Sequence, residues 1–134
     1  MSPGPLADAT VTLKALAHPS RLRALAMLRS GGLCVCQVAA ALGSPVSTVS
    51  EHLSELKRAG LVVERREGRW VTYSLAGEAD PRRLLGQVWS LIARDPVVRH
   101  DERLVRRLRR LPVADLCQAG LDLTRLGFET ARPS

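Results

Sequence analysis

The sequence predicts a mainly helical fold with one small β-hairpin, and three observations support this prediction. Apolar residues recur every three or four positions along most of the 134-residue chain, which is the period of an α-helix. The period changes to two between residues 61 and 75. Glycines and prolines fall between the periodic segments. The length fits a single domain, and an aromatic content of 3% predicts an aliphatic core.

The first helices are bounded by glycine and proline. Residues 1–5 contain two prolines and a glycine, and we expect a flexible N-terminus there. A helix over Leu6–Ala17 ends at His18-Pro19, where His18 caps the next helix or packs near its start. This second helix ends at Ser30-Gly31-Gly32. A short third helix, Val35–Leu42, follows.

The fourth helix has one apolar stripe and one polar face. Gly43 ends the third helix, Ser44 is a good N-cap, and Pro45 is a good first residue. Ala59-Gly60 ends the fourth helix. Its apolar residues repeat at spacings of three and four, and we expect them to be buried: Val46, Val49, Leu53 and Leu56.

A hairpin is predicted next, with Glu67-Gly68 as its turn. Apolar and polar residues alternate in two runs, at Leu61, Val63 and Arg65 and at Val71, Tyr73 and Leu75. Asp80-Pro81 then caps a fifth helix, which is apolar over more of its circumference than one contact covers. In so small a protein we expect its second side to face another subunit. Its apolar residues are Leu84, Leu85, Val88, Trp89, Leu91 and Ile92.

A very basic amphipathic helix is predicted over residues 97–111, with Leu104, Val105, Leu108 and Leu111 inside. Packing within a dimer and contact with DNA are both open for this helix, and packing is favoured. His100-Asp101-Glu102 is expected to form a solvated turn. The chain is thus divided into a folded domain over residues 6–111 and a C-terminal segment over residues 112–134 that carries Cys117.

The order of the elements predicts a helix-turn-helix over residues 35–59, and the hairpin fits a wing. In this arrangement the second helix of the pair enters the major groove of DNA. Hydroxyl and other polar groups on its outer face reach bases or phosphates, and the arginines of the wing contact the backbone or the minor groove. Simple solvation or capping is the alternative for the hydroxyls. The predicted DNA contacts are Ser47, Thr48, Ser50, Glu51, His52, Ser54, Lys57, Arg65, Arg66 and Arg69.

The formal net charge of +7 favours a nucleic-acid partner, although a bias toward arginine from genome base composition is an alternative. No apolar run reaches the roughly 18 residues of a membrane span, and the N-terminus does not resemble a signal peptide. We therefore expect a cytoplasmic protein with no membrane partner. The sequence contains no GxSxG, GxGxxG, HExxH or phosphate-binding loop, so we expect no catalytic residues and no enzyme activity.

Residues 12–95 resemble the ArsR/SmtB family of metalloregulatory repressors. The resemblance is carried by ALAHPSRL, by CVC before the short helix, by STVSEHLSELKRAGLV and by REGRWVTYSL. The CVC motif resembles the arsenic-sensing branch. The resemblance implies a homodimer that pairs through the N-terminal helix and the helix near 81–94. It implies that this dimer binds a palindromic double-stranded operator and releases it when a toxic ion binds. No cofactor is expected for folding, and the implied inducer is As(III) or Sb(III).

Cys34 and Cys36 are the predicted inducer ligands because thiolates suit thiophilic ions. Residues two apart in a helix point about 200° apart. In an extended segment they point to the same side. Joint ligation therefore favours a non-helical first turn of the third helix. Ion binding there is expected to fray or bend the helix start, shift the reading helix and weaken operator binding.

Trivalent arsenic forms bonds to three sulfurs, so a third ligand is needed beside Cys34 and Cys36. Arsenic-sensing relatives have a third cysteine three residues after the second, and this chain has Ala39 there. Cys117 is the remaining thiol, from the same chain or its partner, and a small buried hydrophobic residue is the alternative. Zinc sensors of the family that this sequence resembles use a carboxylate and histidines on the long dimer helix. No histidine follows Asp80 two residues on, so a histidine-based zinc site is not expected.

Several rival functions fit the same residues. The thiols are also suited to cadmium, lead or copper(I), or to oxidants and persulfides through a disulfide such as Cys34–Cys117. A passive metal buffer and an architectural DNA-binding protein belong to other functional classes. A buffer would bind the ion without affecting DNA, and an architectural protein would show no marked sequence preference.

Overall fold

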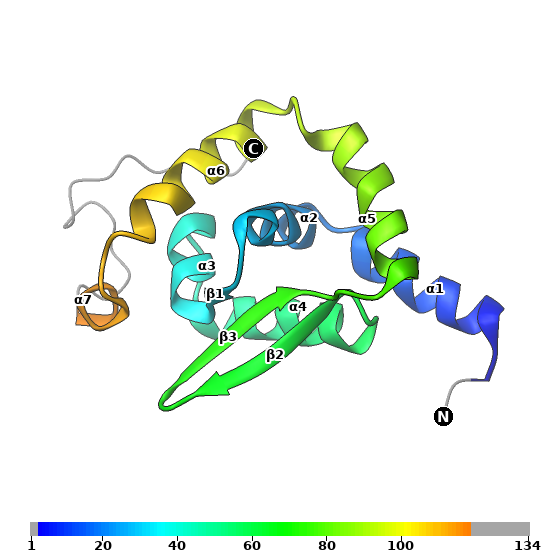
Figure 1. The fold of residues 1–134 in the computed structure, drawn as a ribbon, viewed down its shortest axis with the longest axis horizontal. Helices are drawn as coiled ribbons and strands as arrows, with labels where there is room; N and C mark the ends of the chain where they lie inside the picture. Colours follow the sequence, from blue (N-terminus) through cyan, green and yellow to red (C-terminus); the bar gives the residue numbers. More distant parts are fainter. Residues whose placement is uncertain (1–2, 119–134) are drawn as a thin grey trace.

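The computed structural model describes residues 3–118, except for the side chains of residues 117 and 118. The first two helices, α1 and α2, are joined at Ala17-His18, and a short 3-10 helix, η1, extends α2 (Figure 1). A three-stranded sheet and five further helices follow. The elements are α1 (Pro5–Leu16), α2 (Pro19–Met27), η1 (Leu28–Ser30), β1 (Leu33–Cys34), α3 (Val35–Leu42), α4 (Val46–Arg58), β2 (Val62–Glu67), β3 (Trp70–Leu75), α5 (Ala79–Ile92), α6 (Pro96–Leu108) and α7 (Val113–Gln118). The predicted fold class, mainly helical with a hairpin, is confirmed.

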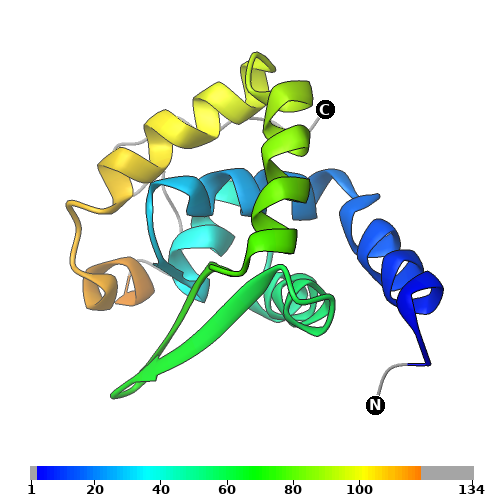
Figure 2. The same ribbon diagram turned by 45° about the vertical axis from the view of Figure 1, so that its right-hand side comes forward.

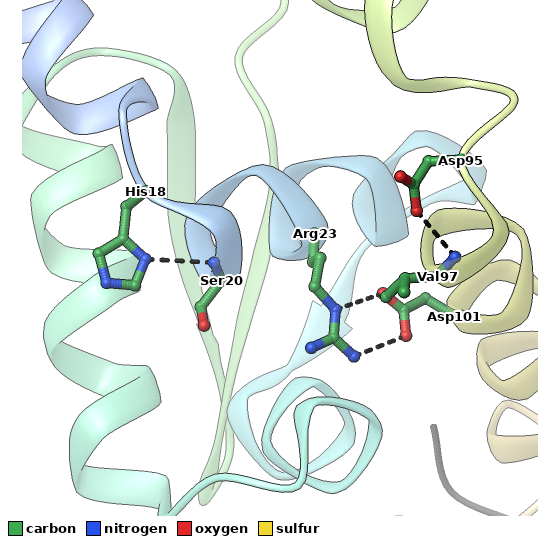
Figure 3. Close-up of polar contacts among 6 residues, drawn as sticks. All are labelled: His18, Ser20, Arg23, Asp95, Val97 and Asp101. Atoms are coloured by element: carbon green, nitrogen blue, oxygen red, sulfur yellow. Dashed lines mark hydrogen bonds and ion pairs between the residues drawn. The ribbon is translucent and has the colours of Figure 1, made fainter. Parts of the chain in front are cut away.

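The predicted cap of α2 is present. The backbone N–H of Ser20 donates to Nδ1 of His18 at 3.1 Å, and Pro19 occupies the first helical position (Figure 3). Because the first N–H groups of a helix have no partner within it, this side-chain acceptor satisfies one of them.

Four predicted helix starts differ from the structure by one or two residues: α1 begins at Pro5 rather than Leu6, α6 begins at Pro96 rather than residue 97, and the starts of α4 and α5 also differ. Pro45 has an extended ψ of 145° and is itself the N-cap of α4, so the helix begins at Val46 and Ser44 does not cap it. A residue before proline is pushed away from helical angles, which keeps Ser44 in the turn. Helix α5 begins at Ala79 with Glu78 as N-cap, and Pro81 lies inside the first turn, where no N–H is needed.

The sheet has the strand order β1-β3-β2, and both pairs are antiparallel. In the hairpin Glu67 pairs with Trp70, so the two turn residues are Gly68 and Arg69 rather than Glu67-Gly68. Gly68 has φ +60°, which glycine adopts at no steric cost. Strand β1, which the sequence did not predict, adds a short third strand on the other side of β3.

The alternation predicted for the first strand was also wrong in part. Leu61 and Val62 are both buried, whereas Val63 is half exposed. Leu61 lies before β2 and accepts a hydrogen bond from the backbone N–H of Ala76, so the turn places it in the core outside the strand periodicity.

An aliphatic core lies where α2, α3 and α4 pack together. The stripe of α4 is buried as predicted at Val49, Leu53 and Leu56, while Val46 is 38% exposed at the helix start. Residues 37–42 of α3 are all buried, so this short helix is held on every side.

The basic helix is confirmed as α6, although it ends at Leu108 rather than at residue 111, and its apolar face packs on α2 and α3 of the same chain. Leu104, Val105 and Leu108 are buried there. Helix α7 then packs against α3. Figures 1 and 2 both place α6 across the molecule from the tip of the β2–β3 hairpin.

The prediction of a solvated turn at His100-Asp101-Glu102 was wrong. These residues lie within α6, and Asp101 is only 1% exposed. Arg23 of α2 donates from its Nε and an Nη to the two oxygens of Asp101, at 2.8 and 2.9 Å (Figure 3). A buried carboxylate needs such a partner, and this one joins α2 to α6. Within residues 3–118, no helix combines the length and apolar character needed to span a membrane.

Candidate thiol site and nucleic-acid interface

Helices α3 and α4 form the predicted helix-turn-helix, joined through Gly43, Ser44 and Pro45. Gly43 has φ +67°, the left-handed angle typical of a residue that ends a helix. Because one stripe of α4 is buried, its opposite face is exposed, and most of the predicted DNA-contacting residues lie there. Ser47, Thr48, Glu51, Ser54 and Lys57 are exposed, and Ser50 is half buried.

His52 is less exposed than most of the predicted DNA-contacting residues of α4. It is half buried against α2, where the Nε–H of Arg21 donates to its Nδ1 at 3.2 Å. Its ring centroid lies 4.5 Å from that of His18. The pKa of His52 is lowered by burial and, to a lesser degree, by His18 and Arg21, against an opposing effect of Glu51. The neutral ring therefore helps dock α4 on α2, and its contact with DNA stays a prediction.

We expect the stability of the fold to decrease slightly below about pH 6.5, the ordinary pKa of histidine. A lowered folded-state pKa means that the unfolded chain binds the proton more readily, so stability present above this pH is lost as the pH falls. Protonation would also remove the acceptor for Arg21. Thermal melts at pH 7.5 and 5.5 should show an acid-induced decrease that is about one to two degrees larger for the native protein than for His52→Gln. Equal decreases would contradict this role of His52.

Lys57 links α4, the second helix of the helix-turn-helix and here called the reading helix, to the wing formed by β2 and β3. Its Nζ lies 2.9 Å from Oε2 of Glu64 on β2, and the hydroxyl of Tyr73 on β3 lies 3.4 Å from the same oxygen. The hydrogen bond from Lys57 lowers the pKa of Glu64, which therefore stays a carboxylate. Arg65, Arg66 and Arg69 are exposed on the hairpin, and Arg65 lies 3.6 Å from Glu67. The wing thus carries exposed arginines, and the ion pair between Glu64 and Lys57 attaches strand β2 to α4.

The two neighbouring thiols lie where β1 becomes α3. Cys34 is the N-cap of α3, with an extended backbone at φ −80° and ψ 160°, and it is 5% exposed. Cys36 lies in the first helical turn and is half buried. The backbone N–H of Cys34 donates to the amide oxygen of Gln37 at 2.9 Å, as part of a capping box. This box fixes the junction between strand and helix.

The expectation of a non-helical first turn in the third helix was wrong, but Cys34 lies just before this helix as its N-cap. The helix is regular from Val35, so Cys36 is helical, but Cys34 is extended. The 200° separation of two helical residues therefore does not apply to this pair. Both thiol residues line one hollow of about 250 Å³ that α4 and the wing complete. Its lining residues are Cys34, Val35, Cys36, Val46, Ser50, Arg69, Trp70 and Val71.

The third predicted ligand lies at the edge of what the structure describes. Cys117 belongs to α7, which packs against α3, but its side chain lies outside the described part. Among the described residues, no three histidine, cysteine, aspartate or glutamate side chains are grouped so that they could hold a metal ion. Cys117 as third ligand stays a prediction.

Sequence reasoning missed the contacts that hold the loop before Cys34. Arg109 at the end of α6 donates to the carbonyls of Gly31 and Gly32 and to the hydroxyl of Ser30. These partners are separated by 77 to 79 positions, so no local pattern reveals them. The only sequence signal was the Gly31-Gly32 pair itself, which the prediction used as a helix end.

The buried helix pair, the polar outer face of α4 and the cationic hairpin together define a winged helix-turn-helix protein of the DNA-binding regulator class. A family model described as "Bacterial regulatory protein, arsR family" matches residues 18–63. The chain belongs to the ArsR family, which supports the prediction of a regulator rather than an enzyme.

Two curated relatives illustrate the similarity. The arsenic resistance transcriptional regulator ArsR1 of Pseudomonas putida is 41% identical over 69 residues, which cover 51% of this chain and 54% of that protein. The HTH-type transcriptional regulator NmtR of Mycobacterium tuberculosis is 49% identical over 69 residues, covering 52% and 58%. The chain thus spans little more than half the length of these curated relatives.

One solved structure is similar to this chain over most of the solved structure's length. The homodimeric winged helix-turn-helix domain Mb0332 of Mycobacterium bovis, a possible ArsR-family transcriptional regulator, has a TM-score of 0.60 and 34% identity. The match covers 72% of this chain and 94% of that one. The similarity therefore includes the winged fold and is not limited to the helix-turn-helix.

Proposed function

We propose that the protein is a dimeric transcriptional repressor that binds a palindromic operator and is released when trivalent arsenic or antimony binds to Cys34 and Cys36. One observation carries this proposal: both thiol residues line the same hollow as Ser50 of the reading helix and Arg69 of the wing. An ion held there lies beside two groups predicted to touch DNA. Ligand and operator can therefore influence each other's binding through two shapes of one site.

The chemistry of the hollow suits a thiophilic centre. Arsenous acid exchanges each hydroxyl for a cysteine sulfur, and each As–S bond formed releases one water, made from that hydroxyl and the proton of the thiol. Two sulfurs come from Cys34 and Cys36, and Cys117 on the neighbouring α7 is the proposed third. Valine and tryptophan side chains add apolar surface to the hollow, and Ser50 and Arg69 add polar groups.

Self-association through α1 and α5 completes the proposal. Each of these helices carries large apolar side chains in solvent, with Leu6 83%, Leu13 59% and Leu91 84% exposed. The M. bovis domain with 34% identity is described as homodimeric. A dimer would bring two reading helices to two half-sites of a palindrome.

A second candidate keeps the regulator and changes the signal. With two thiol residues in the hollow and the third undescribed, cadmium, lead, copper(I) or oxidation of the thiols also fits the site. The names of the relatives do not converge on one inducer, since only the first of the two curated regulators is named for arsenic.

Fluorescence anisotropy with an operator-like duplex and a scrambled duplex tests the proposal. We expect preference for the operator, and release at lower concentrations of arsenite or antimonite than of cadmium, lead, copper(I) or peroxide. Release by one of the latter at the lowest concentration favours the second candidate. Equal binding to both duplexes would leave only an architectural role, and ion binding without release would leave a metal buffer.

A further inference from the structure

The end of α6 is tied to the loop that leads into the thiol site. An Nη–H of Arg109 donates to the carbonyl of Gly32 at 2.9 Å. The other Nη donates to the carbonyl of Gly31 at 2.9 Å and to the hydroxyl of Ser30 at 3.1 Å. One guanidinium thus serves three acceptors on three successive residues, an arrangement that its planar fork of donors suits.

On its other side the same loop is pressed against β3. Gly31 has φ +125°, a backbone angle that side chains other than hydrogen rarely tolerate. A Cβ on Gly32 would lie 2.7 Å from the hydroxyl oxygen of Ser74 and 3.0 Å from a methyl carbon of Thr72. The loop therefore runs between Arg109 and the wing strand, with no room for a side chain at Gly32 and a backbone angle at Gly31 that favours glycine.

Cys34 follows this loop directly. Leu33 pairs with Tyr73 and Cys34 pairs with Thr72, so the clamped glycines set where β1 enters the sheet. Cys34 has an extended backbone, and its side chain lines the same hollow as that of Cys36 in the helix. The contact of Arg109 with Gly32 thus acts two residues before the first thiol.

Helix α6, which carries Arg109 at its end, is itself held firmly against the rest of the protein. Leu108, next to Arg109, is fully buried, and one turn earlier Leu104 is 3% exposed. The buried pair of Arg23 and Asp101 holds the first half of α6 on α2. Arg109 therefore extends from a rigid support, which is what a positioning residue requires.

We propose that Arg109 is a positioning residue of the thiol site: it holds the Ser30–Gly32 loop so that Cys34 and Cys36 bind one arsenical jointly. The inference rests on the proposed role of these two thiols as the inducer site. Preorganised ligands avoid the ordering cost of capture, so the clamp raises affinity for a centre that bonds to both sulfurs. It does not raise the reactivity of either thiol alone.

Phenylarsine oxide is the probe, because it bonds to two thiols and releases one water, with no change of oxidation state. The 134-residue chain carrying Cys117→Ser keeps Cys34 and Cys36 as its two thiols. Its affinity is measured without DNA, by competition with a small dithiol. We expect Arg109→Ala to lower this affinity about tenfold, corresponding to one or two net hydrogen bonds. Arg109→Lys should have an affinity between those of the native residue and Arg109→Ala, since an ammonium group lacks the planar fork of donors.

Arg110→Ala is the matched control, because it removes an exposed arginine at the adjacent position and should leave the affinity within about twofold. Alkylation of Cys36 by iodoacetamide, which needs one thiol, should proceed at the native rate in Arg109→Ala. Native phenylarsine oxide affinity in both Arg109 variants would overturn the proposal. An equal loss in both the dithiol and the single-thiol assay would also overturn it. Because DNA is absent, the result is independent of whether arsenite releases the operator.

Discussion

The double variant Cys34→Ser/Cys36→Ser is expected to bind the operator as tightly as the native dimer and to remain bound when arsenite is added. Serine has nearly the shape of cysteine, but its hydroxyl offers arsenic no gain over water. Both residues line the hollow beside Ser50 and Arg69, so their loss removes the ligand without removing a predicted DNA contact. The half-release concentration should rise on the order of a hundredfold or more, about 2.7 kcal/mol of lost coupling.

Fluorescence anisotropy on a labelled operator measures this directly. Each single variant should have a half-release concentration between those of the native protein and the double variant, because one thiolate still binds arsenic. Cys117→Ser separates the roles: a shift as large as that of the double variant makes Cys117 a required ligand, and no shift makes it dispensable. Circular dichroism melts check that serine at the buried position 34 leaves the fold intact. Native release by a folded double variant would defeat the proposed function.

Local signals carried most of the fold prediction. Proline and glycine place helix ends by restricting φ and ψ within a few residues, and so Pro19 and Gly43 bounded α2 and α3 correctly. The starts of α4 and α5 were missed by one or two residues, because the observed N-caps, Pro45 and Glu78, make no side-chain capping hydrogen bond. Strand β1 was missed for a different reason. Two residues become a strand only through pairing with β3, which lies about 40 positions away.

The candidate site also has some features that local sequence signals predicted and others that they could not. The exposed face of α4 followed from helical period alone, and the two thiols followed from their spacing. The sequence could not show that Lys57 reaches Glu64 across the wing, or that His52 faces Arg21. Nor could it show that Asp101 is buried, because a carboxylate in a basic segment is typical of a solvated surface. Each of these contacts depends on tertiary packing that brings separate elements together.

Asp101→Asn is expected to cause the largest loss of stability among single substitutions of charged residues in α6. The side chain of Asp101 is 1% exposed and that of Arg23 is 10% exposed, so the variant leaves a buried guanidinium without its counter-charge. Removing one partner of a buried pair costs about 3–5 kcal/mol. Urea unfolding at fixed protein concentration measures the change, since a dimer's stability depends on concentration.

Two further variants decide whether charge pairing is the cause. Glu102→Gln changes the neighbouring carboxylate, which is 40% exposed and lies 4.0 Å from Arg29, and should change stability by less than about 0.5 kcal/mol. Arg23→Met/Asp101→Leu removes both charges and fills the space with apolar atoms. It should recover most of the lost stability, because the pair's desolvation cost disappears together with its attraction. If the double variant is as unstable as Asp101→Asn, the shape of the contact holds α6 on α2, and the charges do not.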